Sequence, residues 1–484
     1  MWSDLDSLVE ASMQEWKVPG LALAVIQDGE IAVLKGYGVR DTGTGQPVTT
    51  DTQFLLCSIT KSFTAAGLGL LVDERKLDWD RPVRDVIPEF RLHDPVATER
   101  LTLRDLLCHR SGLPRHDWVH QPGDLSGAQM LPLLRHLMPN RELRDAFQYS
   151  NLGYMVAGIV AERISELSWE DFIAERLLKP LGIEEFSFTI EALAAADNAA
   201  RPHAMVDDEC TRAPLWPIRT TAGGGINTSV AELAKWVGFL IDEGRVNGIQ
   251  LLSPQALREM ATPRVHMARS EYAEIGDSHY GHGLFCESYR GDRTLSHSGS
   301  WLGWGTLMTV MPTRRAGVVV LTNRAPSAVT SLLTYAALDQ ISGREPVDWF
   351  SRLVPKRRGF IDQQKTDKAR REEKRCVGTQ PSHALDEYAG SYEHPAYGRI
   401  EITSSHIGLA WRWRGLSGPL THWHYDVFTT PDRPSEFYPD NLALTFLYDR
   451  EGRIDRVAAP FEPQVSDIVF QRTPEPAQAA KAKP

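Results

Sequence analysis

The chain has 484 residues, of which 42% are apolar and 24% charged, a mixture typical of a globular protein with a large core. Its formal net charge is -10, and this acidic balance argues against nucleic acid as a partner, because phosphate binding requires a basic surface. The five cysteines are scattered and form no C-x-x-C pair, which argues against a structural zinc site and a dense disulfide framework.

The N-terminus and the hydropathy pattern bear on where the protein works. No positively charged stretch precedes an apolar run at the N-terminus, so we expect no signal peptide. No apolar run is long enough to span a bilayer, so we expect no membrane partner. The sequence therefore predicts a cytoplasmic protein, although a secreted form already trimmed of its leader would begin in the same way.

The hydrophobic pattern predicts strands on both sides of a mainly helical middle. Asp28-Gly29 separates two apolar runs and signals a β-hairpin, and Thr102 stands where a helix cap is expected. In chain order the pattern predicts a helix at 5–16, strands at 21–26 and 31–34, helices at 60–75, after Thr102, at 152–164, 169–178 and 229–240, strands at 307–311 and 318–321, and a helix at 329–341. This order predicts one α/β domain with a mixed sheet over residues 1–345.

The composition changes in the rest of the chain. Residues 346–382 are basic and poor in apolar side chains, which predicts a solvated linker or an exposed helix rather than a nucleic-acid surface. Over residues 383–473, short β-like runs separated by turn residues predict a small antiparallel barrel or sandwich. Residues 474–484 are rich in Ala, Pro and Lys and predict a disordered tail.

Ser58-Ile59-Thr60-Lys61 places a serine and a lysine three residues apart where the predicted 60–75 helix begins. Residues at this spacing share a helix face, so we expect the Lys61 amine beside the Ser58 hydroxyl. A serine needs an adjacent base to act as a nucleophile, and a lysine can serve when burial lowers its pKa. An exposed helix start would look the same in isolation, but the flanking apolar residues indicate a buried one.

Tyr149-Ser150-Asn151 precedes the predicted 152–164 helix. A phenol near a lysine can relay protons, and the Asn151 amide offers both a donor and an acceptor. The alternative is structural, because Ser150 or Asn151 would also cap the helix well.

His297-Ser298-Gly299-Ser300 is the third motif, and it follows a predicted strand. Gly299 lets a substrate backbone approach closely. The backbone N–H after it can complete an oxyanion hole together with the N–H of Ser58.

The order S-x-x-K, Y-x-N, H-x-G resembles the class C β-lactamase-like, penicillin-binding-protein-like family of serine hydrolases, which includes D-alanyl-D-alanine carboxypeptidases, D-aminopeptidases and esterases. The resemblance covers residues 5–341 and includes the stretches 16–20, 101–114, 179–182, 222–225 and 280–283. It implies an antiparallel sheet flanked by helices plus a helical subdomain. Residues 385–392 and 397–400 are similar to the lipocalin-like β-domain often attached to these hydrolases.

The resemblance also implies roles for single residues. Ser58 would be the acylated nucleophile, Lys61 its activator and Tyr149 a general base or proton shuttle, and which of the latter two takes the proton stays open. Ser58 and Ser300 N–H groups would hold the oxyanion. The substrate-binding residues would be Asn151, His297, Gly299 and Ser300.

One departure from the family concerns His297-Ser298-Gly299, where penicillin-hydrolysing members carry Lys-Thr-Gly. A lysine offers a permanent charge to a substrate carboxylate, whereas a histidine is largely neutral at pH 7. The departure therefore favours the D-aminopeptidase and esterase branches over β-lactams or D-Ala-terminated peptides.

We therefore expect a serine hydrolase that acts through a Ser58 acyl-enzyme on a small-molecule or peptide substrate, an amide, an ester or a peptide that contains D-amino acids, with no cofactor and no metal. One alternative is an acyltransferase or peptide cyclase, in which an amine or alcohol replaces water. Another is a non-catalytic ligand-binding protein, which the three intact motifs disfavour. A homo-oligomer stays open.

Weaker signals have structural explanations. His422 and His424 share a strand face but have no acidic or cysteine neighbour, so we expect no metal there. Cys57 is interpreted as a small buried apolar residue and His109 as structural. Trp301 and the nearby Trp304 would either line an apolar pocket or belong to the core.

Overall fold

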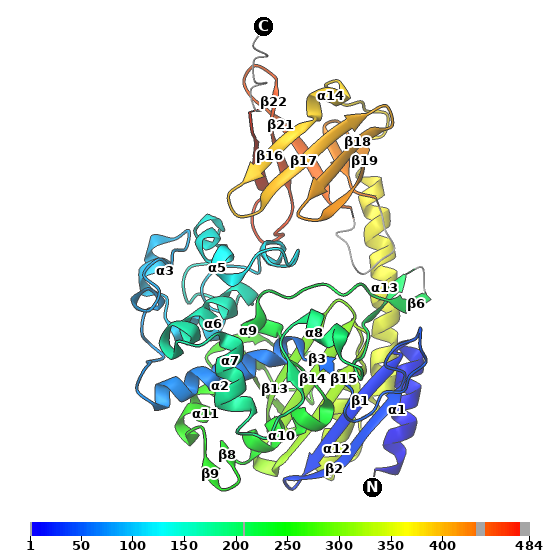
Figure 1. Ribbon diagram of the computed structural model, residues 1–484. Helices are drawn as coiled ribbons and strands as arrows, with labels where there is room; N and C mark the ends of the chain where they lie inside the picture. The colour runs from blue at the N-terminus through cyan, green and yellow to red at the C-terminus, as the bar shows by residue number, and fades with distance from the viewer. Residues whose placement is uncertain (1, 207–208, 432–440, 475–484) are drawn as a thin grey trace.

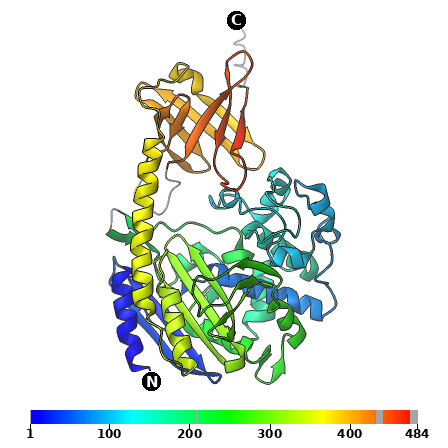
Figure 2. The same ribbon diagram turned by 180° about the vertical axis from the view of Figure 1, so that it is seen from behind.

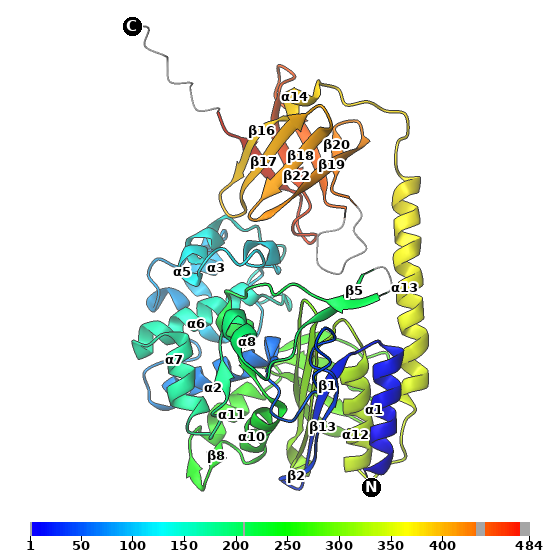
Figure 3. The same cartoon turned by 45° about the vertical axis from the view of Figure 1, so that its right-hand side comes forward.

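The computed structural model describes residues 2–206, 209–431 and 441–474. The chain forms a larger α/β body and a smaller β-barrel, and helix α13 (Trp349–Glu373) runs along one side from the first to the second (Figures 1 and 3). The predicted disordered tail lies outside the described residues, apart from residue 474.

An eight-stranded sheet in the order β10-β11-β12-β13-β14-β15-β1-β2 organises the larger body. Its strands are β1 (Gly20–Gln27), β2 (Glu30–Gly38), β10 (Val265–Ala268), β11 (Ser278–Tyr280), β12 (Phe285–Tyr289), β13 (Asp292–Trp301), β14 (Trp304–Met311) and β15 (Ala316–Thr322). Neighbouring strands of this sheet are antiparallel in the described residues, which confirms the antiparallel sheet that the family resemblance implies. The mixed sheet expected from the order of the elements is wrong. The reason is connectivity, because β10 to β15 follow one another through short connections, which join antiparallel neighbours.

The central strands are buried on both faces because alternate side chains enter two different cores. The cross-strand partners Leu23 and Val320 face α1 (Ser3–Glu15) and α12 (Val329–Ile341), and Figure 2 shows these helices on one face of the sheet. The next pair, Ala24 and Val319, belongs to the core on the opposite face.

The helical part covers that opposite face and carries the start of α2 (Thr60–Asp73), where the first motif lies (Figure 1). Its other α-helices are α3 (Pro95–Arg100), α4 (Leu103–Leu107), α5 (Gly127–Met130), α6 (Asn151–Ser165), α7 (Trp169–Ile173), α8 (Ile190–Ala195), α9 (Thr221–Gly224), α10 (Val230–Ile241) and α11 (Pro254–Met260). Thr102 caps α4 as predicted, through the N–H of Asp105. The predicted 169–178 helix is α-helical only to Ile173 and continues over Ala174–Leu178 with wider π-type turns.

Short elements complete this body. The strands β3 (Phe54–Leu55), β7 (Asn227–Thr228) and β4 (Phe186–Ser187) form a small sheet, and β5 (His203–Val206) pairs with β6 (Glu209–Arg212) and β8 (Arg245–Val246) with β9 (Ile249–Gln250). Short 3₁₀-helices are η1 (Cys57–Ile59), η2 (Val83–Asp85), η3 (Asp117–Val119), η4 (Leu131–His136) and η6 (Pro312–Arg314).

The C-terminal part is a closed antiparallel barrel, because β16 pairs with both β17 and β23. Its elements are α14 (Leu385–Tyr388), β16 (Gly390–His394), β17 (Gly398–Ser405), β18 (Gly408–Trp413), β19 (Leu416–His424), β20 (Val427–Thr429), β21 (Ala443–Tyr448), β22 (Ile454–Ala459) and β23 (Ile468–Arg472). Buried aromatic rings such as Tyr392, Trp413 and Phe446 fill the interior. The predicted barrel is confirmed.

The basic stretch before the barrel forms the exposed helix that was one of its two predicted states. Most side chains of α13 beyond Trp349 are exposed or half-buried. Among the helices that the structure describes, none combines the length and the apolar composition that crossing a bilayer requires.

Candidate active site

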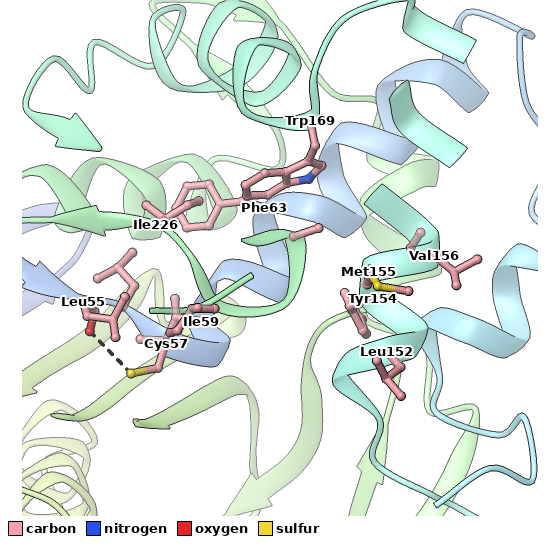
Figure 4. Close-up of a cluster of buried hydrophobic side chains, with 14 of the residues drawn as sticks. Leu55, Cys57, Ile59, Phe63, Leu152, Tyr154, Met155, Val156, Trp169 and Ile226 are labelled. Carbon is pink, nitrogen blue, oxygen red and sulfur yellow. Dashed lines mark hydrogen bonds between the residues drawn. The ribbon is translucent and has the colours of Figure 1, made fainter. Parts of the chain in front are cut away.

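Ser58 lies in the tight turn η1 immediately before α2, and Lys61 lies in the first turn of that helix. The Lys61 Nζ and the Ser58 Oγ are 3.1 Å apart, as the spacing predicted. Cys57, just before Ser58, has φ 51°, a left-handed conformation that costs a non-glycine residue energy and persists where the surroundings enforce it. Figure 4 shows the enforcing surroundings, an apolar cluster that includes Leu55, Ile59 and Ile226.

Lys61 is fully buried and makes three hydrogen bonds. Its Nζ donates to the Gly223 carbonyl at 2.6 Å, the Asn151 Oδ1 at 2.8 Å and the Ser58 Oγ at 3.1 Å. Burial lowers the pKa of Lys61 well below its usual value, and the positive charge of Arg115 lowers it further. The amine is therefore easier to deprotonate than a free lysine and is held against the Ser58 hydroxyl.

Tyr149 completes the group around the serine. Its hydroxyl donates to the Ser58 Oγ at 2.8 Å, and Lys61 Nζ lies 4.8 Å from the centre of its ring. Burial raises the pKa of Tyr149, so the phenol keeps its proton at neutral pH. The His109 ring packs 4.3 Å from the Tyr149 ring and its Nδ1 accepts the Ser150 N–H, which agrees with a structural role for His109.

Ser150 and Asn151 have different contacts at the start of α6. Ser150 is the helix cap, because its side chain accepts the Gly153 N–H. This frees Asn151 to accept from Lys61, as described, while its Nδ2 faces the Asp117 Oδ1 at 3.5 Å. The capping explanation is confirmed for Ser150, and the role of Asn151 in the chemistry stays a prediction.

β13 brings the third motif to the Ser58 turn. A Cβ on Gly299 would lie 2.5 Å from the Leu56 carbonyl oxygen and 2.7 Å from the Cys57 Cβ. Glycine is therefore required by the close approach of β13 to the chain's own backbone, whereas the sequence had suggested approach by a substrate. Ser300, one residue further, lines the same cavity as Ser58.

His297 does not line that cavity. It is 1% exposed, its Nε2 hydrogen bonds to the Tyr280 hydroxyl at 2.7 Å, and its Nδ1 lies 2.6 Å from the Ser298 carbonyl oxygen. Burial lowers its pKa to about 3, with a smaller effect from the charge of Lys61. His297 is thus neutral. It shares a face of β13 with Gly299 and Trp301, and the Tyr280 and Phe285 rings pack against it.

The cavity beside Ser58 has a volume of about 220 Å³. Its lining combines polar groups from the motifs with aromatic and apolar side chains: Ser58, Arg115, Trp118, Gln121, Asn151, Trp216, Ser300, Trp301 and Leu302. Trp301 lines this pocket, whereas Trp304 is buried in the core, so each alternative holds for one tryptophan. A larger depression of about 750 Å³ borders α10 and lies away from this chemistry.

The sequence did not reveal Arg115 and Asp117, which the fold brings to the site. The Arg115 guanidinium lies 5.0 Å from the centre of the Tyr149 ring, and its Nε donates to the Asp117 Oδ2 at 2.5 Å. Burial alone would raise the pKa of the Asp117 carboxyl, but the neighbouring His120 and Arg115 hold it below its usual value. No motif marks these residues, and only the loop's position in the fold makes them part of the site.

The remaining candidates stay outside the site. In the described part of the chain no cluster of three or more His, Cys, Asp or Glu side chains could hold a metal, and the His422 Nε2 bonds instead to the Tyr425 carbonyl oxygen. Cys57 is a free thiol whose pKa burial raises, which fits an apolar packing role.

Comparison with known proteins places this geometry in context. A family model described as Beta-lactamase matches residues 5–341, and a model described as a domain of unknown function matches residues 374–472. The chain is 26% identical over 424 residues to an unguisins hydrolase, ungD', of Aspergillus campestris, across 82% of this chain and 77% of that protein.

Solved structures share the fold. An octameric penicillin-binding protein homologue from Pyrococcus abyssi superposes with a TM-score of 0.61 at 23% identity, across 97% of this chain and 99% of that one. A class C beta-lactamase superposes with a TM-score of 0.58 at 21% identity, across 71% of this chain and 97% of that one.

An antiparallel sheet flanked by helices, with a serine and a lysine at the start of a buried helix, defines the β-lactamase-like class of fold. The match over residues 5–341 shows that the chain belongs to the β-lactamase family. Its family and its hydrolase-named relative identify it, in general terms, as a serine hydrolase.

Proposed function

We propose that the protein hydrolyses a small amide, peptide or ester through an acyl-enzyme on Ser58. The observation that carries this proposal is that one hydroxyl, at the edge of a cavity, contacts both the buried Lys61 amine and the Tyr149 phenol. A serine in contact with a base and a second proton donor is the arrangement that nucleophilic catalysis requires.

We assign the proton acceptor to Lys61, because its three partners are not equivalent. The Gly223 and Asn151 oxygens can only accept hydrogen bonds, so a neutral Lys61 keeps its two N–H groups on them. Its lone pair then faces Ser58, the one partner that can donate. The proton of the Ser58 hydroxyl passes to this nitrogen as Oγ attacks the substrate carbonyl carbon.

Tyr149 acts from the other side of the serine. As a protonated phenol it donates to the Ser58 Oγ at rest. When the tetrahedral intermediate collapses, the bond from carbon to the leaving amine or alcohol breaks, and the leaving group takes a proton from Tyr149, which Lys61 then reprotonates. Water repeats the sequence on the ester and restores Ser58.

The remaining motif residues bind the substrate in this proposal. The backbone N–H groups of Ser58 and Ser300 hold the developing oxyanion, since donors aimed at that charge lower the barrier. The Asn151 amide hydrogen bonds to the substrate, and Gly299 keeps β13 close. His297, buried and neutral, fixes the strand and, unlike the lysine of penicillin-hydrolysing members, itself offers no charge to a substrate carboxylate.

The residues that line the cavity indicate what kind of acyl group the substrate carries. Trp118, Trp216 and Trp301 present aromatic surface beside Ser58, and large aromatic surfaces bind apolar groups. We therefore propose a substrate with an aromatic or branched apolar side chain on the acyl side. In this scheme residues 1–345 form the hydrolase domain and residues 383–473 the β-domain, joined by the 346–382 stretch.

Intact-protein mass spectrometry tests the proposal. Wild type and Ser58→Ala are mixed with p-nitrophenyl esters, D-amino-acid amides and a penicillin, and we expect a transient acyl adduct on wild type alone. An added amine that appears in the product would identify acyl transfer in place of hydrolysis. Turnover by Ser58→Ala at the wild-type rate would refute the mechanism.

A further inference from the structure

One short segment, residues 115–124, separates the active-site cavity from the barrel, and we call it the bridging segment. On one side Arg115, Trp118 and Gln121 line the cavity that contains Ser58. On the other side the same segment contacts three turns at one end of the barrel. Figure 1 shows this end of the barrel facing the α/β body.

The barrel contacts the bridging segment through polar groups. The Glu462 Oε2 accepts the His116 N–H at 2.6 Å, and the Tyr397 hydroxyl lies 2.7 Å from the His116 Nδ1. Arg414 donates from Nη1 to the Trp118 and Val119 carbonyl oxygens, at 3.2 and 2.9 Å.

Arg414 is well placed for this task. It and Gly415 form the two-residue turn between β18 and β19, both with positive φ, which aims the side chain out of the barrel. Its Nε donates to the Asp124 Oδ2 at 3.0 Å, and a second nitrogen pairs with the other carboxylate oxygen. The Arg414 side chain is only 8% exposed, although its partner Asp124 is partly exposed, so the guanidinium makes these charge-assisted hydrogen bonds from a mostly buried position.

Apolar packing follows the same boundary. Trp118 meets the Trp413 ring at 5.9 Å and the Phe461 ring at 6.1 Å, both from the barrel. Trp118 also lines the cavity beside Ser58. One side chain therefore belongs to the substrate pocket and to the contact between the two parts of the chain.

The backbone of the bridging segment needs external support. His116 has φ 45° and ψ 40°, a left-handed conformation that is unfavourable for a residue with a side chain. Its N–H bonds to Glu462, its Nδ1 to Tyr397 and its Nε2 to the Met138 carbonyl oxygen. Two of these three partners come from the barrel, so the barrel helps to enforce the conformation.

The conformation of His116 matters because its two neighbours, Arg115 and Asp117, contact residues around Ser58. Arg115 stacks over the Tyr149 ring, and Asp117 faces the Asn151 amide, whose oxygen accepts from Lys61. A shift of the bridging segment would therefore move both the wall of the pocket and the charges around Lys61.

We propose that Arg414 and Glu462 are positioning residues through which the barrel fixes the bridging segment, and that the barrel thereby sets the preference of the active site for large apolar acyl groups. This inference rests on the proposed function. It makes the barrel a part of the substrate pocket's architecture, although no barrel residue lines the cavity that contains Ser58 among the residues described.

The test compares Arg414→Ala with wild type on two esters, p-nitrophenyl acetate and p-nitrophenyl phenylacetate. Misplacement of a pocket wall by about 1 Å costs up to about 100-fold in rate, so we expect kcat/KM to fall at least about 10-fold for phenylacetate. The loss should lie mainly in KM, and acetate, whose acyl group is a single methyl and needs little aromatic surface, should change far less. Hydrogen exchange over residues 115–124 should become faster.

Three further variants sharpen this test. Arg412→Ala, two residues before Arg414 on β18 and facing solvent, is the matched control and should behave as wild type. Arg414→Lys should lie between wild type and Arg414→Ala, because a lysine keeps the charge but not the forked geometry. Asp124→Asn weakens the same contact at a partly exposed residue and covers the case in which Arg414→Ala does not fold.

The outcomes separate this inference from the proposed function. A fluorophosphonate probe should label Ser58 in wild type and in every Arg414 variant, and failure to label wild type would overturn the proposed function itself. If Ser58 is labelled, equal losses on both esters, or unchanged selectivity together with faster exchange over residues 115–124, would overturn the role assigned to the barrel.

Discussion

At the scale of single residues, the most informative group is Lys61, because its burial and its partners constrain its chemistry. If the neutral amine is the base, activity rises with pH as Lys61 loses its proton. Since burial lowers the pKa of Lys61, this rise should occur well below the usual lysine range.

The pH dependence of kcat/KM on a neutral ester measures the pH at which Lys61 loses its proton. Lys61→Arg keeps a positive charge but cannot supply a neutral amine, so it should be as inactive as Lys61→Ala, with losses of about 10²–10⁴-fold. An active Lys61→Arg enzyme would show that charge, and not proton transfer, is what the position provides.

Tyr149 gives a second prediction at this scale. Tyr149→Phe removes the hydroxyl that donates to Ser58 and should lower kcat by about 10²–10⁴-fold, with little change in KM. Tyr154→Phe is the matched control, because this neighbouring hydroxyl donates to the Leu107 carbonyl oxygen and does not contact Ser58. Steady-state kinetics on one ester compare the two variants, and equal losses would contradict a specific role for Tyr149.

The sequence predicted the parts of the site that local geometry determines. Ser58 and Lys61 are three residues apart, so a helix alone brings them together. Arg115 and Asp117 are more than fifty positions from Ser58 along the chain, and no periodicity indicates where their loop will lie. Long-range placement of loops depends on packing that a motif does not encode.

At the scale of elements, the approach of β13 to the turn before α2 determines the geometry of the site. The sequence predicted a strand here but not its neighbour, and so the reason for Gly299 was attributed to the substrate. The same limit applies to His297, since alternation places it on the strand face of Trp301, which lines the cavity, but does not predict that the buried Tyr280 hydroxyl will bond to its Nε2. For the sheet as a whole, the pattern predicted strands but not their antiparallel order.

Gly299→Ala tests whether the site needs the close contact between β13 and the turn before α2. The added Cβ would collide with the Leu56 carbonyl oxygen and the Cys57 Cβ, so β13 must move away from Ser58. Overpacking of this kind costs about 1–3 kcal/mol of stability, and we expect a lower Tm and a strong loss of kcat/KM.

The control for this variant is Gly238→Ala, in α10, where a Cβ meets no atom within 4 Å. Alanine is the better helix former, so this change should preserve activity and leave Tm unchanged or higher. Thermal unfolding and ester kinetics on both variants give the comparison. Wild-type activity in Gly299→Ala would show that the close contact is dispensable.

At the scale of the whole molecule, the α/β body and the barrel meet beside the active site, and each of them contains buried polar side chains. Several histidines are held neutral inside the structure. Burial lowers the pKa of His297 and of His282 to about 3 and that of His394, in the barrel, to about 4. These histidines therefore bind a proton at a much lower pH in the folded chain than in the unfolded chain.

This difference predicts a loss of stability in acid. Below the unfolded pKa of about 6.5, the unfolded chain binds protons that the folded chain does not, so the free energy of unfolding falls as the pH falls from 6.5 toward 3. His282 is the best residue at which to test this loss of stability, because neither ring nitrogen has a hydrogen-bond partner in the described structure. His282→Leu should lose less Tm than wild type between pH 7 and pH 5, while the exposed His406→Leu should follow wild type. Identical slopes in all three proteins would show that His282 is protonated within the folded state, and that the acid sensitivity of the molecule has another origin.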